Sequence, residues 1–337
     1  MGLFFYTKIG SIISIGDLPT TNIIEPQIEL LHKRGLIITD YKRAKKYLLT
    51  NNYYSIINGY SKYFEQSPNK YRPGTNFSEI TYSYFYDKEI KYSFLKAILE
   101  AEKHIKSAIA YVFSERFAST PYFYLDINNY NKSNSDNVRK IKFVIRQMVK
   151  IIDKHKSSRQ ANSIQHYFSK HLEIPFWVII DYLTFGDMLA ILQTLPISLQ
   201  DKISKKFYSF ICEHIKININ FTPAILVSFV ENIGEVRNVC AHDNRLFSFK
   251  CKKSVKYYSD LHSNYGISNS CAKSSPYHVF IVLQCFLSSI EYAKLHNTLL
   301  SRFKTFEKHL LTVSIDKFLT ELGFPANWHR TMPKLPQ

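Results

Sequence analysis

The sequence lacks the motifs that mark several common enzyme classes. It contains no Walker-type phosphate loop, no GxGxxG fingerprint and no GxSxG turn, so nothing in it indicates a P-loop NTPase, a dinucleotide-binding domain or an α/β-hydrolase. The five cysteines include no CxxC pair, which is typical of a reduced cytosolic chain with free thiols. A zinc site built from Cys251, His262, Cys271 and His278 would need spacings that fit no standard ligand pattern. We therefore expect no metal and no cofactor.

Long apolar runs are absent too, and acidic residues are few. No stretch approaches 18 apolar residues, so we expect no transmembrane helix and a cytoplasmic protein. The 44 Lys and Arg residues outnumber the 27 Asp and Glu residues, which gives a net charge of +17. This excess favours a polyanionic partner, most commonly RNA or DNA. An AT-biased genome, which enriches Lys, Asn, Ile and Tyr, would give the same excess without any nucleic-acid partner.

Apolar residues recur at intervals of three to four along most of the chain, and few runs alternate with period two, so an all-α fold is predicted. Capping residues and prolines place the ends of several helices. The predicted helices are Glu25 to Gly35, Asp40 to Leu49, Ser78 to Phe113, Val138 to Ile152, Pro175 to Pro196, Thr222 through residues 237–242, and Val279 to Leu295. Residues 1–22 are interpreted as a loose arm and Ser67 to Gly74 as a loop. The expected organisation is an N-terminal helical region (1–75), a helical core (76–300) and a C-terminal tail (301–337).

The segment Arg237-Asn238-Val239-Cys240-Ala241-His242 carries the most informative pattern, R-N-x-x-x-H. A guanidinium can clamp a phosphate, and an imidazole can move a proton near neutral pH. On a helix with about 100° per residue, Glu231, Glu235, Asn238, His242 and Arg245 would share one polar stripe opposite an apolar arc. Arg237 would lie about 140° from His242, at the edge of that arc. An ordinary solvated helix face is the alternative interpretation.

Other polar residues are candidates for support. Glu100, Glu102 and His104 fall in the predicted 78–113 helix, where a carboxylate could orient an imidazole or pair with an arginine. Arg245 and the basic residues Lys250, Lys252 and Lys253 are candidates for RNA binding. The tyrosine-rich block at 53–63 could stack on bases, although a place in the core is the favoured interpretation.

Five colinear segments resemble the Abi-like proteins of the AbiD/AbiF group over residues 25–250. The segments are Glu29 to Ile37, Asn52-Tyr53-Tyr54 with Asn58-Gly59-Tyr60, Ala97 to Tyr111, Pro175 to Val178 with Thr184-Phe185-Gly186, and Arg237 to His242 with Asn244-Arg245-Leu246. Two positions depart from the pattern: Asp243 stands where the family often has a second histidine, and Phe247 replaces a tryptophan. The segment after residue 250 finds no counterpart.

The resemblance implies a HEPN-like helical bundle with an N-terminal helical extension, and a role in abortive infection, a bacterial defence against phage. HEPN ribonucleases typically form dimers and cut RNA without metal. Those roles would fall on Arg237 and His242, with Asn238 as the polar second residue. The resemblance also implies restraint by a noncoding RNA.

The sequence therefore predicts a metal-independent endoribonuclease that forms a homodimer, binds RNA and does not bind membranes. Arg237, Asn238 and His242 are its catalytic candidates, and Glu100, Glu102 and Glu235 are its supporting ones. A non-catalytic RNA-binding sensor of the same defence class is the main alternative, because charge and tyrosines fit it equally. A structural helical protein is a third possibility.

Overall fold

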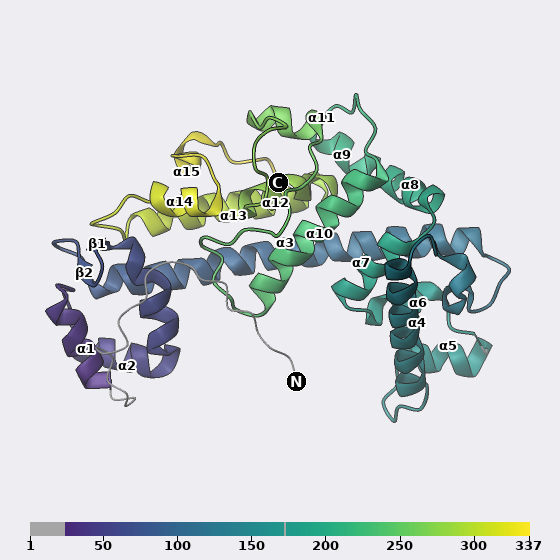
Figure 1. Ribbon diagram of the computed structural model, residues 1–337, viewed down its shortest axis with the longest axis horizontal. Coiled ribbons are helices and arrows are strands. Elements are labelled where there is room, and N and C mark those ends of the chain that lie inside the picture. The colour runs from purple at the N-terminus through teal and green to yellow at the C-terminus, as the bar shows by residue number, and fades with distance from the viewer. Residues whose placement is uncertain (1–23, 172) are drawn as a thin grey trace. The chain divides into compact units, whose positions relative to one another are not determined.

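The computed structural model describes residues 24–171 and 173–337, and helices dominate this part of the chain (Figure 1). The all-α class expected from the sequence is confirmed, since the sheet found in the described residues is one two-stranded hairpin. The predicted arm at 1–22 lies outside the described residues. The described chain divides into two compact units, one of residues 24–90, 301–320 and 325–331 and one of the remainder. The three-part organisation expected from the sequence stays a prediction.

The first unit joins the N-terminal elements to segments near the C-terminus. Figure 1 shows α1, α2 and the hairpin in purple and blue, and α14 and α15 in yellow. Its elements are α1 (Ile24–Lys33), α2 (Tyr41–Asn51), a π-helical turn (Tyr54–Asn58), a 3-10 turn (Ser61–Tyr63), β1 (Glu65–Ser67), β2 (Lys70–Tyr71), the start of α3 (Phe77–Arg116), the end of α13 (Ser289–Glu307), most of α14 (Asp316–Leu322) and α15 (Trp328–Thr331).

Aromatic rings form much of the first unit's core. Phe318 of α14 lies with its ring centroid 5.0 Å from that of Tyr63 and 4.9 Å from that of Phe306. Tyr60 and Tyr63 are buried, which confirms the core interpretation for these two tyrosines, whereas Tyr54 is 70% exposed. The residues after 301, expected to form a tail, thus contribute helices and buried rings to a packed core.

Local chemistry explains the ends of the first helices. Asp40 caps α2, its carboxylate accepting a hydrogen bond from the Arg43 amide, as predicted. Gly35, at φ +91°, follows the end of α1, which confirms the predicted stop. The predicted loop from Ser67 to Gly74 was wrong in part, because Lys70 and Tyr71 pair with the strand that ends at Ser67. Asn69, at φ 62°, takes the left-handed conformation that so tight a turn requires.

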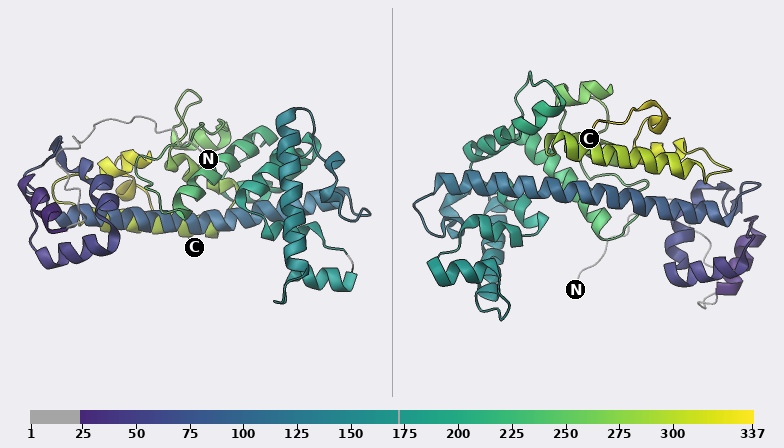
Figure 2. Two further views of the ribbon diagram at one scale, coloured as in Figure 1. Left: turned by 60° about the horizontal axis from the view of Figure 1, so that its bottom comes forward. Right: turned by 180° about the vertical axis from the view of Figure 1, so that it is seen from behind.

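The second unit is built around α10 (Pro223–Ala241), which packs against α7, α8 and α12. The teal helices α4, α5 and α6 of Figure 2 contact one another, and α4 also packs against α7. Its elements are the rest of α3, 3-10 turns at Phe123–Leu125 and Ile127–Asn129, α4 (Ser135–Lys156), α5 (Ser163–His171), α6 (Phe176–Tyr182), α7 (Phe185–Thr194), α8 (Ile197–Lys206), α9 (Tyr208–His214), α10, α11 (Ser259–His262), a 3-10 turn (Ser263–Tyr265), α12 (Pro276–Val282), a 3-10 turn (Leu283–Cys285) and the start of α13.

Two helices predicted as continuous are broken in the structure. The helix expected from Pro175 to Pro196 is interrupted at Leu183, because Thr184 and Asp187 form a reciprocal capping box that begins α7. The helix expected from Val279 to Leu295 ends at Val282. A new helix follows once Ser288 and Glu291 exchange hydrogen bonds in the same manner. Both runs are mostly apolar on either side of the break, so their periodicity did not reveal the interruptions.

Candidate functional site

Helix α10 presents the R-N-x-x-x-H segment at its C-terminal end. Thr222 caps the helix by accepting a hydrogen bond from the Ile225 amide, and Pro223 occupies the first turn, as predicted. The apolar arc expected opposite the polar stripe is buried in the structure, which confirms that part of the helical pattern. Its residues are Leu226, Phe229, Val230, Ile233, Val236 and Cys240.

The polar stripe is shorter than the sequence indicated. Glu231 and Glu235 are half-buried on α10, and Asn238 and His242 are exposed. The helix ends at Ala241, with His242 as its C-cap residue. The placement of Arg245 on the stripe was wrong, because the chain has left the helix before this residue, where Asp243 adopts a φ of 54°.

Arg237 joins a group of charged side chains at the interface between α10 and α3. Its Nε lies 3.9 Å from Glu102 Oε2, and the other oxygen of Glu102 lies 3.0 Å from Lys106 Nζ. Lys106 also donates a hydrogen bond of 2.7 Å to the Leu183 carbonyl. The side chain of Glu102 is only 10% exposed. A buried carboxylate is costly unless it is paired, and these two cations compensate its charge.

The Arg237 guanidinium is held by charge and is not saturated with hydrogen bonds. The 3.9 Å separation is too long for a hydrogen bond, and both Arg237 Nε and Glu102 Oε2 are buried without such a partner among the described residues. A long contact of 3.5 Å joins Arg237 Nη1 to Asn238 Oδ1. With 27% of its side chain exposed, Arg237 keeps N–H groups that could donate hydrogen bonds to a phosphate oxygen.

A buried lysine fixes the turn that follows His242. Lys91 of α3, whose side chain is 2% exposed, lies 2.6 Å from Asp243 Oδ1 and donates a 3.1 Å hydrogen bond to the Asn244 carbonyl. The His242 amide itself donates to the Asn238 carbonyl at 3.0 Å. The backbone that carries the exposed imidazole is therefore held by the helical hydrogen bond before it and by the Lys91 contacts after it.

A groove follows the exposed face of α10 toward Asn238. One pocket of about 290 Å³ is lined by Glu231, Glu235 and Asn238 from α10, by Lys252 and Lys253, and by residues of α7. A second pocket of about 420 Å³ shares Gln193, Glu231 and Lys253 with the first and continues to Lys256. Each carboxylate has a partner: Gln193 Nε2 donates to Glu231 at 2.6 Å, and the Lys252 amide donates to Glu235 at 2.9 Å.

The structure separates the candidate residues into two sets. It brings Arg237 together with Glu102 and Asn238, and it places Glu235, Lys252 and Lys253 along the groove. Glu100 is half-buried and has no hydrogen bond or ion pair within the described chain, and His104 instead contacts the Phe286 carbonyl at 2.8 Å. Lys250 and Arg245 are exposed and line neither pocket.

Two lysines of the site, Lys91 and Lys106, were missed from the sequence. Both belong to the buried face of α3, together with Phe94, Ile98 and Ile105. A lysine at helical spacing within an apolar face is the signal that could have revealed them, since such a charge needs a partner when buried.

Cys251 at the edge of this region is not a reactive thiol. Burial raises its pKa to about 12, and the nearby Glu235 carboxylate acts in the same direction. The thiol therefore stays protonated at neutral pH and is a poor nucleophile. Arg237, Asn238 and His242 remain the candidate residues of the site.

Together, these features define an all-α protein with an arginine and a histidine at the exposed end of a buried helix. Residues 46–248 match the family of Abi-like proteins. Since this segment covers more than half of the chain and includes the whole of α10 with its R-N-x-x-x-H segment, the chain belongs to the Abi-like family. The family places it in abortive-infection defence.

No curated protein and no solved structure matches the chain significantly. None of the described helices combines the length and apolar character needed to cross a membrane.

Proposed function

We propose that this protein is a metal-independent endoribonuclease of the HEPN type, related to the AbiD/AbiF group, that acts in abortive infection. The observation that carries the proposal is the pairing of Arg237 with the buried Glu102 next to the exposed Asn238, at the helix end that also carries His242. This arrangement holds a cation at the surface and leaves part of its guanidinium accessible. A proton-transfer group, His242, follows Arg237 by five residues.

The expected chemistry is transesterification by the RNA itself. A base removes the proton of a 2′-hydroxyl, whose oxygen attacks the adjacent phosphorus. The bond to the 5′-oxygen then breaks, and an acid protonates the leaving oxygen. Arg237 would stabilise the charge on the phosphate, and His242 would serve as one of the two proton-transfer groups, a contribution of roughly 10²–10⁴ in rate.

The groove along α10 offers a path for the RNA strand. Lys252, Lys253 and Lys256 line one side of it and would contact phosphates. Glu231 and Glu235 on its floor cannot face phosphates, but their remaining lone pairs can accept hydrogen bonds from base amino groups. A strand with its backbone on the lysine side and its bases over α10 satisfies both requirements.

A homodimer would complete the catalytic pair, because one chain supplies one histidine in this segment while the reaction needs both a base and an acid. Light scattering should therefore show a dimer at working concentrations. A monomer with full activity would contradict this part of the proposal.

The decisive experiment is RNA cleavage in the presence of EDTA. The wild-type protein should cut single-stranded RNA and leave 2′,3′-cyclic phosphate ends. His242→Ala and Arg237→Ala should each lose about 10² or more in rate while remaining folded. His32→Ala, which removes an exposed histidine of α1, is the matched control and should keep full activity.

Strict dependence on an added divalent metal, or His242→Ala with wild-type activity, would refute the mechanism. If no RNA is cut but RNA still binds and Lys252→Gln with Lys253→Gln weakens that binding, the non-catalytic RNA sensor becomes the better account. The lysines along the groove would bind RNA with or without cleavage, so they support the RNA sensor as well as the ribonuclease.

A further inference from the structure

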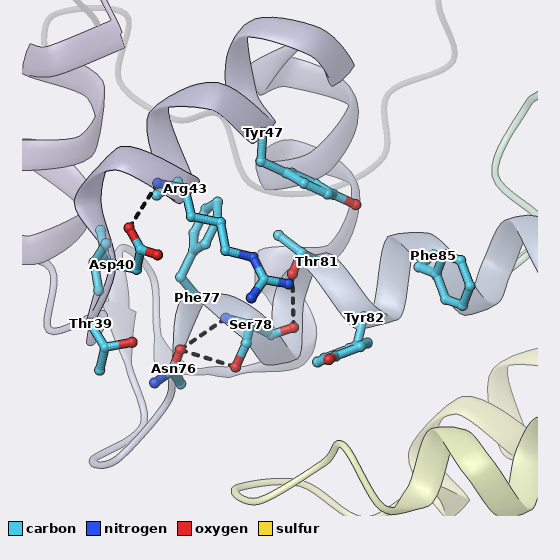
Figure 3. Close-up of a pocket in the computed structure, with 12 residues that line it drawn as sticks. Thr39, Asp40, Arg43, Tyr47, Asn76, Phe77, Ser78, Thr81, Tyr82 and Phe85 are labelled. Atoms are coloured by element: carbon cyan, nitrogen blue, oxygen red, sulfur yellow. Dashed lines mark hydrogen bonds between the residues drawn. The ribbon is translucent and has the colours of Figure 1, made fainter.

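A pocket of about 270 Å³ opens in the first unit, where α2 and the start of α3 meet. Figure 3 shows its lining, with Asp40, Arg43 and Tyr47 from the α2 side and Asn76 to Phe85 from the α3 side. Its volume is near the lower end of small-molecule sites, about 300–1,000 Å³. None of its residues belongs to the site on α10.

Arg43 brings an available cation into this pocket. Its backbone amide donates to Asp40, but its guanidinium makes no hydrogen bond or ion pair with any residue that the structure describes. In Figure 3 the Arg43 side chain points toward the α3 side of the pocket, which Ser78 and Thr81 also line. A planar guanidinium in this position has up to five donors for a phosphate group.

Aromatic rings surround the cation. Tyr82 is stacked on His309, with ring centroids 3.8 Å apart and an interplanar angle of 16°, and this two-ring stack can take a further planar group. Tyr47 packs edge-on against Phe77, and Phe85 is 46% exposed. Burial raises the pKa of Tyr47 to about 12, so its hydroxyl stays protonated and can donate a hydrogen bond.

Small polar groups complete the lining. One oxygen of Asp40 accepts from the Arg43 amide, and Ser78 donates to Asn76 Oδ1 at 3.0 Å. The second Asp40 oxygen would repel a phosphate but suits a ribose hydroxyl or a base amino group. A ligand that fits must therefore be planar at one end and anionic at the other, with hydrogen-bond donors between them.

We propose that this pocket binds a nucleoside phosphate, with the base against Tyr82 and the phosphate on Arg43. The ligand is either a free nucleotide or one unit of an RNA chain, since both present the same chemistry. The proposal does not depend on cleavage at the α10 site and is tested separately from it.

The test is calorimetric titration of the full-length protein with AMP, GMP, CMP, UMP, inorganic phosphate and a tetraribonucleotide. The His242→Ala chain is used for the tetranucleotide, so that cleavage cannot interfere. At least one nucleotide should bind in a one-to-one ratio, and inorganic phosphate should bind at least tenfold more weakly. Arg43→Gln and Tyr82→Ser should each weaken nucleotide binding about tenfold or more, whereas Tyr82→Phe should keep it.

Lys46→Gln is the matched control, because Lys46 is an exposed cation of α2 that does not line the pocket. It should leave binding unchanged, and thermal melts should show all variants folded. Tighter binding of the tetranucleotide than of any mononucleotide, with the same losses in the variants, identifies an RNA chain as the source. Comparable affinities identify a free nucleotide. Absence of binding, equal binding of phosphate alone, or wild-type affinity in both Arg43→Gln and Tyr82→Ser would overturn the proposal.

Discussion

Glu102 holds Arg237 in position by charge attraction and not by a hydrogen bond. Its carboxylate, 3.9 Å from Arg237 Nε and 3.0 Å from Lys106 Nζ, attracts the arginine without saturating its donors. The 3.9 Å separation balances a fixed position of Arg237 against the availability of its hydrogen-bond donors. A closer pair would hold Arg237 more firmly but would occupy the donors that a phosphate needs.

Glu102→Gln should therefore lower RNA cleavage by about tenfold or more, since misplacement of a catalytic group by about 1 Å can cost about 10²-fold. Most of the loss should be in kcat. Glu102→Asp, which keeps the charge, should retain more activity than the isosteric glutamine. Glu100→Gln is the control, because Glu100 lies on the same helix without an ion pair in the described chain. A glutamine variant as active as the wild type would show that Glu102 only contributes to packing.

Gly234 tests how closely α10 approaches α7. A Cβ at this position would lie 2.6 Å from Phe185 Cε1, and the buried ring has little room to move. Gly234→Ala should destabilise the protein, because overpacking costs about 1–3 kcal/mol and the helix-propensity gain of about 1 kcal/mol offsets only part of it.

Gly186→Ala provides the comparison, since its Cβ would meet Thr184 Oγ1 at an ordinary 3.7 Å. This variant should be neutral or stabilised by up to about 1 kcal/mol. Urea denaturation of both variants measures the difference, and equal midpoints would mean that α7 and α10 are less tightly packed than described.

The sequence revealed the exposed residues of the site better than the buried ones. A recognisable local pattern contains Arg237, Asn238 and His242. The N-cap residue Thr222 marks the start of the helix that carries them. Lys91 contacts Asp243, 152 positions away, and Lys106 contacts the Leu183 carbonyl, 77 positions away, in addition to Glu102 on its own helix. The distant contacts cannot be read from one sequence. The prediction for Glu102 rested on residue type alone, and the structure supplies its partner, Arg237.

Helix ends were predictable wherever a side chain acts on its own backbone. Asp40, Gly35 and Thr222 each mark an end at the expected place. The breaks before α7 and α13 also have capping boxes, at Thr184 and Ser288, but the surrounding apolar residues gave the stronger and misleading signal. The pocket at the start of α3 depends on two elements meeting, which periodicity does not encode.

The cap of α12 makes the stability of this element depend on pH. His278 Nδ1 lies 2.7 Å from Ser275 Oγ, and burial lowers the pKa of His278 to about 4, with His262 and the lysines 250 and 273 acting in the same direction. Burial also lowers the pKa values of His262 and His296. Between about pH 6.5 and 4 the unfolded chain takes up protons that the folded chain does not, so stability must fall as pH falls.

His278→Gln separates this effect from other titrations, because glutamine preserves the acceptor at the third helical position but carries no titrating proton. The urea midpoint of the wild type should fall more between pH 7.5 and 5.0 than that of His278→Gln. Equal losses in the two proteins would exclude His278 as a source of the acid sensitivity.

The net charge of +17 exceeds what a short RNA substrate requires. Part of it is gathered along the α10 groove at Lys252, Lys253 and Lys256. A ribonuclease with such a surface would attract RNA throughout the cell and damage its own host. We infer that a bound RNA restrains the protein until infection. This inference rests on the proposed ribonuclease activity.

Such an RNA should bind with strong salt dependence, because phosphate contacts release counterions. Binding to the His242→Ala chain should weaken steeply as salt rises, and Lys252→Gln with Lys253→Gln should reduce the slope of log K against log salt by about one unit per lost contact. Lys154→Gln, an exposed cation of α4 outside the groove, should leave the slope unchanged.

Restraint also predicts a phenotype. Purification from native cells should recover one abundant RNA species with the protein, and expression without that RNA should arrest growth. His242→Ala should relieve the arrest while still binding the RNA, because the proposal assigns cleavage to the imidazole and binding to the lysines. A wild-type protein that is harmless alone and purifies free of nucleic acid would disprove the restraint. If it nevertheless cuts RNA in EDTA, the ribonuclease proposal survives, and the excess charge must serve the capture of substrate.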